Sequence, residues 1–397
     1  MKMAKRLEGI GEYYFSKKLR EIEDLNREGK NIISLGIGSP DQAPHPEVIW
    51  ILNEESRKAN THAYQSYKGS PVLRKAMADW YNKWYGVNLN PDLEILPLVG
   101  SKEGIMHICM TYVNMGDLVL IPNPGYPTYQ SAAKLAGANL VAYELKEENN
   151  WLPDFKELKN LLETKQPDQE TVLMFVNYPQ MPTGQLPTKK LFKELVSFAK
   201  ENNVLLVHDN PYSFILNDEP LSILQAEGIC DHVIELNSLS KSHNMAGWRV
   251  GMMIAKSKHI ENVLRFKSNM DSGMFLPLQL AAAKALSLPA SWYEEVNKLY
   301  RIRKLAVEIM LEGLGCRFSK KQGGLFVWAK IPDEIADGYA LSDLLLYNAN
   351  VFVTPGGIFG SAGNKYIRVS LCAPEEKILE SFERIKKAGF IKPKQHV

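Results

Sequence analysis

The sequence predicts an α/β protein: a large domain with a mostly parallel sheet flanked by helices, plus a smaller α+β domain. Between about residues 70 and 255, helical patterns alternate with short apolar runs. Several of these runs are apolar on both faces, which is typical of parallel strands covered by helices on both sides. Beyond about residue 290, one long amphipathic segment is followed by shorter strand and helix patterns. These observations together predict the architecture.

The elements of the large domain follow from hydrophobic spacing. Apolar residues at helical spacing predict a helix over 72–84, a second that begins at Ser101, and a third over 188–200. Short apolar runs predict strands at residues 118–121, 140–143, 172–176, 204–207, 233–236 and 250–254. In open α/β sheets, ligands bind outside the carboxyl ends of the strands. The residues that follow these runs are therefore the first candidates for a site.

The smaller domain is predicted from the end of the chain. An amphipathic helix is expected over 292–311, and the strand pattern Gly323-Gly-Leu-Phe-Val-Trp-Ala follows it. A helix near 341–347, a strand over 366–371 and a closing helix from Pro374 complete this part. We expect residues 1–45 to pack with the small domain, 46–290 to form the large domain and 291–397 to form the small one.

Composition excludes several classes of function. The 397 residues carry 47 Lys+Arg against 45 Asp+Glu, a net charge of +2 that gives no electrostatic reason to expect nucleic-acid or membrane partners. No apolar run is long enough for a membrane helix, and the N-terminus lacks the apolar segment of a signal peptide. Four scattered Cys suggest buried thiols in a reducing compartment, and the spacing of the eight His predicts no metal site. We expect a cytoplasmic protein.

Chemically informative residues follow two of the predicted strands. His208-Asp209-Asn210-Pro211-Tyr212 follows one run, and Asn237-Ser238-Leu239-Ser240-Lys241 follows another, with Gly247-Trp248-Arg249 shortly after. An acid in such a place is either a turn former or a charge aimed into a site, and a lone lysine is most often a surface residue. A lysine with hydroxyl groups, an arginine and an acid from another strand favours a site.

This grouping resembles the attachment motif S-x-S-K-x-x-x-x-x-G-x-R of the class I aminotransferases, which are pyridoxal-phosphate enzymes of fold type I. Here the motif reads Ser238-Leu-Ser240-Lys241-Ser-His-Asn-Met-Ala-Gly247-Trp-Arg249. The resemblance extends from Ser34-Leu-Gly-Ile-Gly38-Ser-Pro-Asp41 to Tyr366-Ile-Arg368-Val-Ser370. Residues 64–103 are most similar to the branch with LL-diaminopimelate, aspartate and alanine aminotransferases.

The resemblance implies pyridoxal 5'-phosphate as cofactor and three catalytic residues. Lys241 would form an imine with the cofactor aldehyde and then act as the base that moves a proton. Asp209 would face the pyridine nitrogen, and Tyr212 would donate to the ring oxygen O3′. The implied reaction is a ping-pong transfer of an amino group between an α-amino acid and a 2-oxo acid.

Further residues are implied to bind the cofactor. A guanidinium, hydroxyl groups and N–H groups at a helix start suit a phosphate, and the matching residues are Arg249, Ser238, Ser240, Gly100, Ser101 and Lys102. Tyr126 matches the aromatic residue that stacks on the ring. Tyr64 matches a tyrosine that reaches the phosphate of the neighbouring subunit, so the resemblance implies a homodimer with shared active sites.

Arg368 and Gly38 match the residues beside the substrate's α-carboxylate. One position departs from the family, because the pattern N-P-T-G is here Met181-Pro-Thr-Gly. A thioether is a weak acceptor and cannot donate, so Met181 is not expected to be a polar ligand. Asn177 is kept as a cofactor-binding candidate, with Gln180 as the other amide nearby. The altered position leaves open an alternative, a pyridoxal-phosphate-dependent β-lyase (C–S lyase) on the same scaffold.

Overall fold

Seven strands form the central sheet of the computed structural model, which describes residues 2–163 and 170–391. Their order is β2 (Ile95–Leu98), β8 (Gly251–Ala255), β7 (Val233–Ser238), β6 (Leu205–Asp209), β5 (Thr171–Asn177), β3 (Leu118–Asn123) and β4 (Asn139–Glu144). All neighbours from β7 to β4 are parallel, and β8 runs in the opposite direction between β7 and β2. The six predicted strands are confirmed. The four-residue β2 was missed because it is short and contains Pro97.

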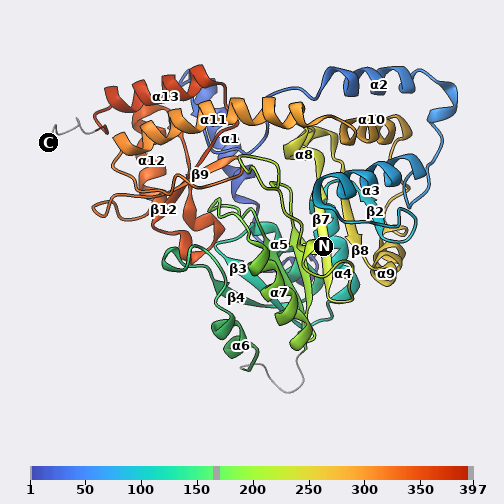
Figure 1. Ribbon diagram of the computed structural model, residues 1–397. Helices are drawn as coiled ribbons and strands as arrows, with labels where there is room; N and C mark the ends of the chain where they lie inside the picture. Colours follow the sequence, from blue (N-terminus) through green and yellow to red (C-terminus); the bar gives the residue numbers. More distant parts are fainter. Residues whose placement is uncertain (1, 164–169, 392–397) are drawn as a thin grey trace.

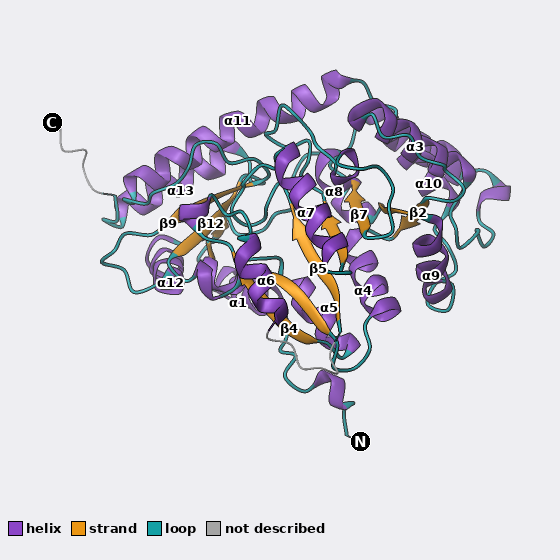
Figure 2. Ribbon diagram, turned by 60° about the horizontal axis from the view of Figure 1, so that its bottom comes forward, coloured by secondary structure: helices purple, strands orange, loops and turns teal. Residues whose placement is uncertain are grey.

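Helices cover both faces of this sheet, and the alternation of side chains along β5 shows why (Figures 1 and 2). Leu173 and Phe175 are buried with α4 (Ser101–Tyr112), α5 (Pro127–Ala136) and α9 (Ser257–Lys267). Met174 and Val176 belong to the core that includes α7 (Lys189–Glu201) and, at the β4 edge, α6 (Phe155–Glu163). Beside β2, α3 (Pro71–Tyr85) and α2 (Pro46–Ser56) both pack on α10 (Leu276–Leu286). Within the described ranges, no helix has the length and apolar composition needed to cross a membrane.

A smaller domain is built on a three-stranded antiparallel sheet. Its strand order is β11 (Thr354–Pro355), β12 (Tyr366–Ser370) and β9 (Phe326–Lys330). The helices α12 (Gly338–Ala349) and α13 (Glu375–Lys387) pack around it. The long helix α11 (Ala290–Gly313) runs along the top of Figure 1, from the region of α10 to this domain. The predicted helices and strands of this part are confirmed.

The N-terminal segment is tied to the smaller domain by backbone and side-chain contacts. Helix α1 (Tyr14–Arg27) is followed by β1 (Ile33–Ser34), which pairs in parallel with β10 (Val351–Phe352). The Ser370 hydroxyl donates to the Ile37 carbonyl at 2.7 Å. Arg303 of α11 holds Asp41 through two bonds of 2.6 and 2.7 Å. These contacts fix the loop that carries Gly38.

The carboxyl ends of the parallel strands meet at one edge of the central sheet. Asn177 and Asp209 are paired in register at the ends of β5 and β6, and Ser238 ends β7. Because β2 runs in the same direction as these strands, the start of α4 at Ser101 lies at this edge too. The fold therefore gathers residues from distant parts of the sequence at one place.

A buried polar cluster lies on the opposite face of β6 from Asp209. The Nδ1 of His208 is 2.9 Å from Glu235 Oε2, and its Nε2 is 2.9 Å from the Tyr178 carbonyl. Both ring nitrogens of His208 lie within hydrogen-bond distance of an acceptor. Glu235 also accepts from Tyr81 at 2.7 Å and from the Ser222 hydroxyl at 2.9 Å. His208 is thus a buried, hydrogen-bonded histidine that pairs with Glu235 directly beneath the edge.

Replacing Glu235 by glutamine should destabilise the fold strongly, since an amide cannot replace the buried carboxylate that hydrogen-bonds Tyr81, Ser222 and His208 together. Breaking a buried pair of this kind costs about 3–5 kcal/mol of unfolding free energy. Urea denaturation of Glu235→Gln checks this. Glu194→Gln is the matched control, because Glu194 is 45% exposed and its partner is Lys190 at 3.7 Å. It should change stability by at most about 0.5 kcal/mol. Equal losses in the two variants would contradict this role of the buried carboxylate.

Candidate active site

A cavity of about 670 Å³ opens between the strand-end edge, the smaller domain and α1. The structure brings most of the predicted site residues to its wall, namely Gly38, Ser101, Lys102, Tyr126, Asn177, Asp209, Tyr212, Ser238, Ser240, Lys241, Arg249 and Arg368. Gly100 lies immediately behind this wall, against Arg249. Tyr64 does not reach the cavity of its own chain, and its side chain is 92% exposed.

Asp209 presents one free carboxylate oxygen to the cavity. Its Oδ2 accepts a hydrogen bond of 2.9 Å from the Tyr129 hydroxyl, whereas Oδ1 is buried without a partner among the described residues. Burial raises the pKa of Asp209 to about 6, although the bond from Tyr129 and the positive charge of His208 oppose the rise. A buried, unsatisfied oxygen is costly, so this atom needs a donor from a ligand. A protonated ring nitrogen would supply one.

Lys241 points its ammonium group into the same space. It lies in α8 (Leu239–Ser242), directly after β7, and its Nζ donates to the Gly38 carbonyl at 2.5 Å. Burial lowers the pKa of Lys241, and the nearby cations Arg368 and Arg249 add to the effect. A lysine with a lowered pKa is more often neutral and therefore nucleophilic. Across the described residues it forms no ion pair within 4 Å.

One end of the cavity is shaped to receive an anion. Arg249 has no carboxylate partner in the described part of the chain, and it donates to the Ala246 carbonyl at 3.0 Å. Gly100 precedes α4 with φ 81° and no side-chain cap, which leaves N–H groups at the start of the helix. A Cβ at Gly100 would lie 2.1 Å from Arg249 Nη2, so only glycine allows this close approach. Ser238 and Ser240 add hydroxyl groups 2.9 Å apart.

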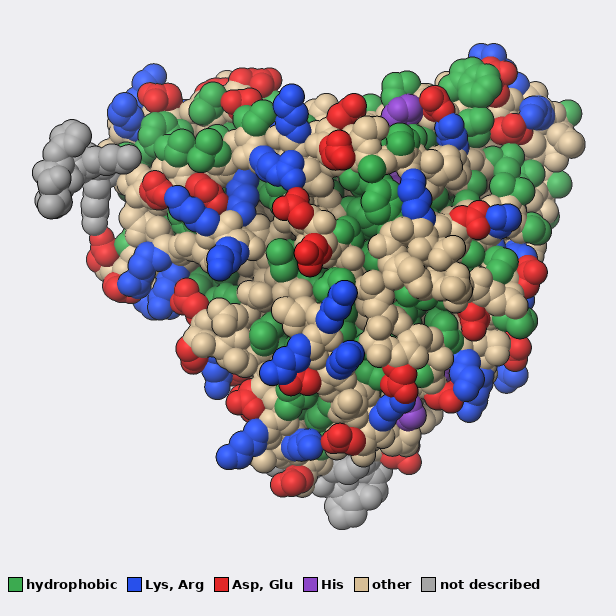
Figure 3. Space-filling model, viewed as in Figure 1, with side chains coloured by type: hydrophobic (Ala, Val, Ile, Leu, Met, Phe, Trp, Pro, Cys, Tyr) green, Lys and Arg blue, Asp and Glu red, His purple; other side chains and the backbone are tan. Residues whose placement is uncertain are grey.

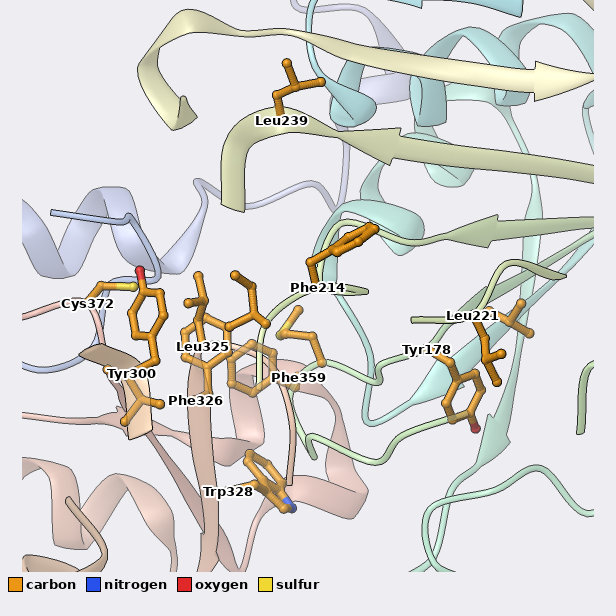
Figure 4. Close-up of a cluster of buried hydrophobic side chains, with 14 of the residues drawn as sticks. Tyr178, Phe214, Leu221, Leu239, Tyr300, Leu325, Phe326, Trp328, Phe359 and Cys372 are labelled. Atoms are coloured by element: carbon orange, nitrogen blue, oxygen red, sulfur yellow. The ribbon is translucent and has the colours of Figure 1, made fainter. Parts of the chain in front are cut away.

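Arg368 is a buried cation without a carboxylate. Its Nη2 donates to the Gly36 carbonyl at 2.9 Å, and its Nε has no partner among the described residues. The guanidinium lies 3.8 Å from the ring centre of Phe326 and 4.6 Å from that of Phe359, two residues of the buried cluster in Figure 4. Burial lowers the pKa of Arg368 to about 10. An isolated buried cation is costly, which favours an anionic ligand here.

The departure at Met181 changes the surroundings of Arg368. The thioether sulfur lies 3.2 Å from Arg368 Nη1 and accepts from it. Asn177 donates to the Asp209 carbonyl at 2.5 Å and accepts from the Met181 N–H at 2.8 Å. Gln180 donates to the Pro124 carbonyl at 2.9 Å. The two neighbouring amides therefore hold the backbone of the loop, and Met181 contributes an apolar wall with one weak acceptor.

Sequence reasoning missed several residues of the cavity wall. The missed wall residues include Tyr13, Phe15, Ser16, Leu19, Ile37, Tyr129 and Phe326. Tyr129 follows Tyr126 by three residues at the start of α5 and so shares its face, but no helix was predicted there. No pattern marked the N-terminal residues, since their place depends on how α1 packs.

A family model for aminotransferases of class I and II matches residues 30–385. The chain belongs to this family. An LL-diaminopimelate aminotransferase of Dehalococcoides mccartyi is 38% identical over 395 residues, which cover 99% of this chain and 100% of the relative. Transaminase BacF of Bacillus subtilis is 37% identical over 375 residues, 94% of this chain and 93% of the relative. The substrate-bound BacF structure has a TM-score of 0.91 at 35% identity and covers 98% of both chains.

The aminotransferase is thus a pyridoxal-phosphate-dependent enzyme of fold type I, with amino-acid and 2-oxo-acid substrates. The predictions of family, fold, reaction class and cofactor are confirmed. The residues of the cavity also fit the cofactor, independently of the comparison with relatives. Asp209 Oδ1 lacks a donor, and Gly100 leaves room beside Arg249 that a Cβ would fill.

The raised pKa of Asp209 predicts a stability cost in the cofactor-free protein. Folding raises this pKa from 3.8 to about 6, so the cost is absent below about pH 4 and complete above about pH 6. Asp209→Asn should therefore stabilise the cofactor-free protein at pH 8 by about 2–3 kcal/mol and have little effect at pH 4. Urea unfolding at the two pH values measures this difference.

The matched control for this experiment is Asp218→Asn, since Asp218 is 89% exposed. Its stability should not depend on pH in this way. A variant Asp209→Asn that is less stable than the wild type at pH 8 would show that another group already satisfies the carboxylate.

Proposed function

We propose that this aminotransferase uses Lys241, Asp209 and Tyr212 as its catalytic residues. One observation carries the proposal: a single cavity holds four cations without acidic partners among the described residues, namely Lys241, Arg368 and the pair Lys102 and Arg249, together with one acid that has a free oxygen. Their number and kinds match an aldehyde carbon, a phosphate, a carboxylate and a protonated ring nitrogen. No simpler ligand accounts for all four.

When bound, pyridoxal phosphate supplies an aldehyde that condenses with amines and a ring that accepts electrons from the substrate carbon. Lys241 Nζ holds the cofactor and accepts the proton from the substrate Cα, for which its lowered pKa suits it. Asp209 Oδ1 accepts from the ring nitrogen and keeps it protonated. Burial raises the pKa of Tyr212, which therefore stays a hydrogen-bond donor for the ring oxygen.

The remaining wall residues position the two ligands. We assign Tyr126, whose ring lies 5.5 Å from that of Tyr129, to the face of the cofactor ring. Asn177 lines the cavity beside Asp209 and borders the ring on that side. We assign the phosphate to a group of polar residues: Gly100, Ser101, Lys102, Ser238, Ser240 and Arg249.

The substrate carboxylate would bind Arg368, next to Gly38. A Cβ at Gly38 would lie 2.2 Å from the Phe326 ring, so the glycine avoids a clash between the Gly38 loop and Phe326. The amino-acid substrate and the 2-oxo-acid substrate both carry this carboxylate, so Arg368 could bind either of them. The named relatives are transaminases, which supports transfer to a 2-oxo acid over elimination by a β-lyase.

We also propose a homodimer in which Tyr64 reaches the partner's phosphate. Support comes from the 92% exposure of Tyr64 and from large apolar side chains exposed nearby, including Trp50 of α2, Val72 of α3 and Phe275 before α10. Figure 3 shows hydrophobic side chains on the surface over this region. A second chain covering it would bury them. We place the protein in the cytoplasm, which agrees with its four free thiols.

The assignment of Lys241 is tested by borohydride reduction of the holoenzyme, which makes a lysine–cofactor linkage permanent. Peptide mass spectrometry should find the added mass on the peptide that contains Lys241. Lys241→Ala should abolish this labelling and lower kcat at least about 10³-fold. The control Lys256→Ala removes an exposed lysine that pairs with Asp231 and should keep both properties. Label on a different lysine would refute the assignment.

The shared active site is tested by mixing two inactive chains. If Tyr64 serves the partner, a dimer of Tyr64→Ala and Lys241→Ala chains has one complete site. Random pairing then restores about a quarter of wild-type activity, because half of the dimers are mixed and one of their two sites works. If Tyr64 acted within its own chain, each site of a mixed dimer would carry a defect and activity would not return.

A further inference from the structure

The cavity has a second end whose chemistry the cofactor does not use. The charged side chains of its wall, among the described residues, are Lys102, Asp209, Lys241, Arg249 and Arg368. Lys102 lies between the two ends: burial and the charge of Arg249 lower its pKa, and its Nζ is 5.0 Å from the ring centre of Tyr13. Apart from Lys102 and Ser16, the wall toward α1 consists of apolar and aromatic residues: Tyr13, Phe15, Leu19, Ile37, Met181 and Phe326.

Arg368 determines where the substrate side chain begins. The guanidinium carbon of Arg368 lies 3.8 Å from the ring centre of Phe326 and 5.6 Å from that of Phe15, so a carboxylate bound to Arg368 would hold the substrate close to these two rings. Leu19 follows Phe15 by four residues in α1 and so lies on the same helix face. The leucine is 40% exposed in the chain and lines the cavity, which leaves apolar surface for a ligand to cover.

No acidic group of this end is free to bind a positively charged side chain. Asp209 is the one acid of the described wall, and it faces the cofactor ring. Glu12, two residues before α1, already accepts hydrogen bonds of 2.7 Å from Arg20 and from the Ser16 hydroxyl. A distal ammonium group, such as that of a diamino acid, would lose water and gain no partner from this chain.

We infer that the substrate carries a large apolar side chain, aromatic by preference, and that an aromatic 2-oxo acid is its product. Rings of Tyr13, Phe15 and Phe326 offer tilted or stacked contacts to such a side chain. The inference rests on the proposed function, because it takes Arg368 as the carboxylate site. It separates this chain from the substrate stated in the name of its LL-diaminopimelate relatives.

The test measures the first half-reaction of the holoenzyme with single amino donors, followed by the absorbance of the cofactor. L-Phenylalanine should exceed LL-diaminopimelate and L-aspartate in kcat/KM by about 10-fold or more, with L-leucine between them. A higher value for LL-diaminopimelate or L-aspartate would overturn the inference and leave the proposed function intact. If no donor changed the absorbance, the proposed function itself would fail.

Equilibrium binding provides a readout that needs no turnover. The unreactive acid 3-phenylpropionate should quench protein fluorescence with a Kd about 10-fold lower than that of glutarate. Tighter binding of glutarate would mean that the far end of the cavity prefers a second carboxylate, against the inference.

A charge placed at Leu19 reverses the preference if this residue contacts the side chain. Leu19→Asp should lower kcat/KM for L-phenylalanine by about 10-fold and raise the ratio of LL-diaminopimelate to L-phenylalanine. The control Leu379→Asp changes a leucine of α13 that is 51% exposed and does not line the cavity, and it should change neither value. Retained cofactor absorbance shows that each variant is folded. An unchanged ratio in Leu19→Asp would contradict the placement.

Discussion

Asp209 carries a carboxyl group at the end of β6 with one oxygen bound by Tyr129 and the other facing the cavity without a partner. A charge in this position is expensive to bury, and its raised pKa reflects that expense. Four neighbours oppose the cost: the hydroxyl groups of Tyr129 and Ser101, and the side chains of His208 and Lys241. Asp209 is thus an acid that still lacks one hydrogen-bond donor, which the cofactor ring would supply in the proposed function.

The same principle extends to the cations of the site. Arg249 and Arg368 lie at separate parts of one cavity, each bonded to backbone carbonyls and neither paired with an acid among the described residues. Like charges without counter-ions destabilise the empty cavity, and anionic ligands relieve this repulsion. The distance between the two guanidinium groups then separates the phosphate from the substrate carboxylate. The positions of the unpaired guanidinium groups therefore determine where anionic ligands can bind.

Sequence alone predicted the core of the sheet and most of the cavity wall. Five of the six apolar runs became strands buried on both faces, which have a strong local signal, and the sixth became the partly exposed edge strand β4. The motif around Lys241 identified the family, since its residues are neighbours in sequence. By contrast, Phe15 and Leu19 reach the cavity because α1 packs against the smaller domain, and no local pattern encodes that contact. The bond between Arg368 and Met181 joins residues 187 positions apart. The proposed contact of Tyr64 would involve a second chain, so the structure of one chain does not contain it.

A crystal structure of the holoenzyme would test the role of Asp209 most directly. The account requires the ring nitrogen to lie within hydrogen-bond distance of Oδ1, while Oδ2 keeps its bond to Tyr129. If the ring nitrogen instead faced another residue, or if Tyr129 released Asp209 to let both oxygens turn away from the ring, the claim that this buried carboxylate organises the site would be wrong.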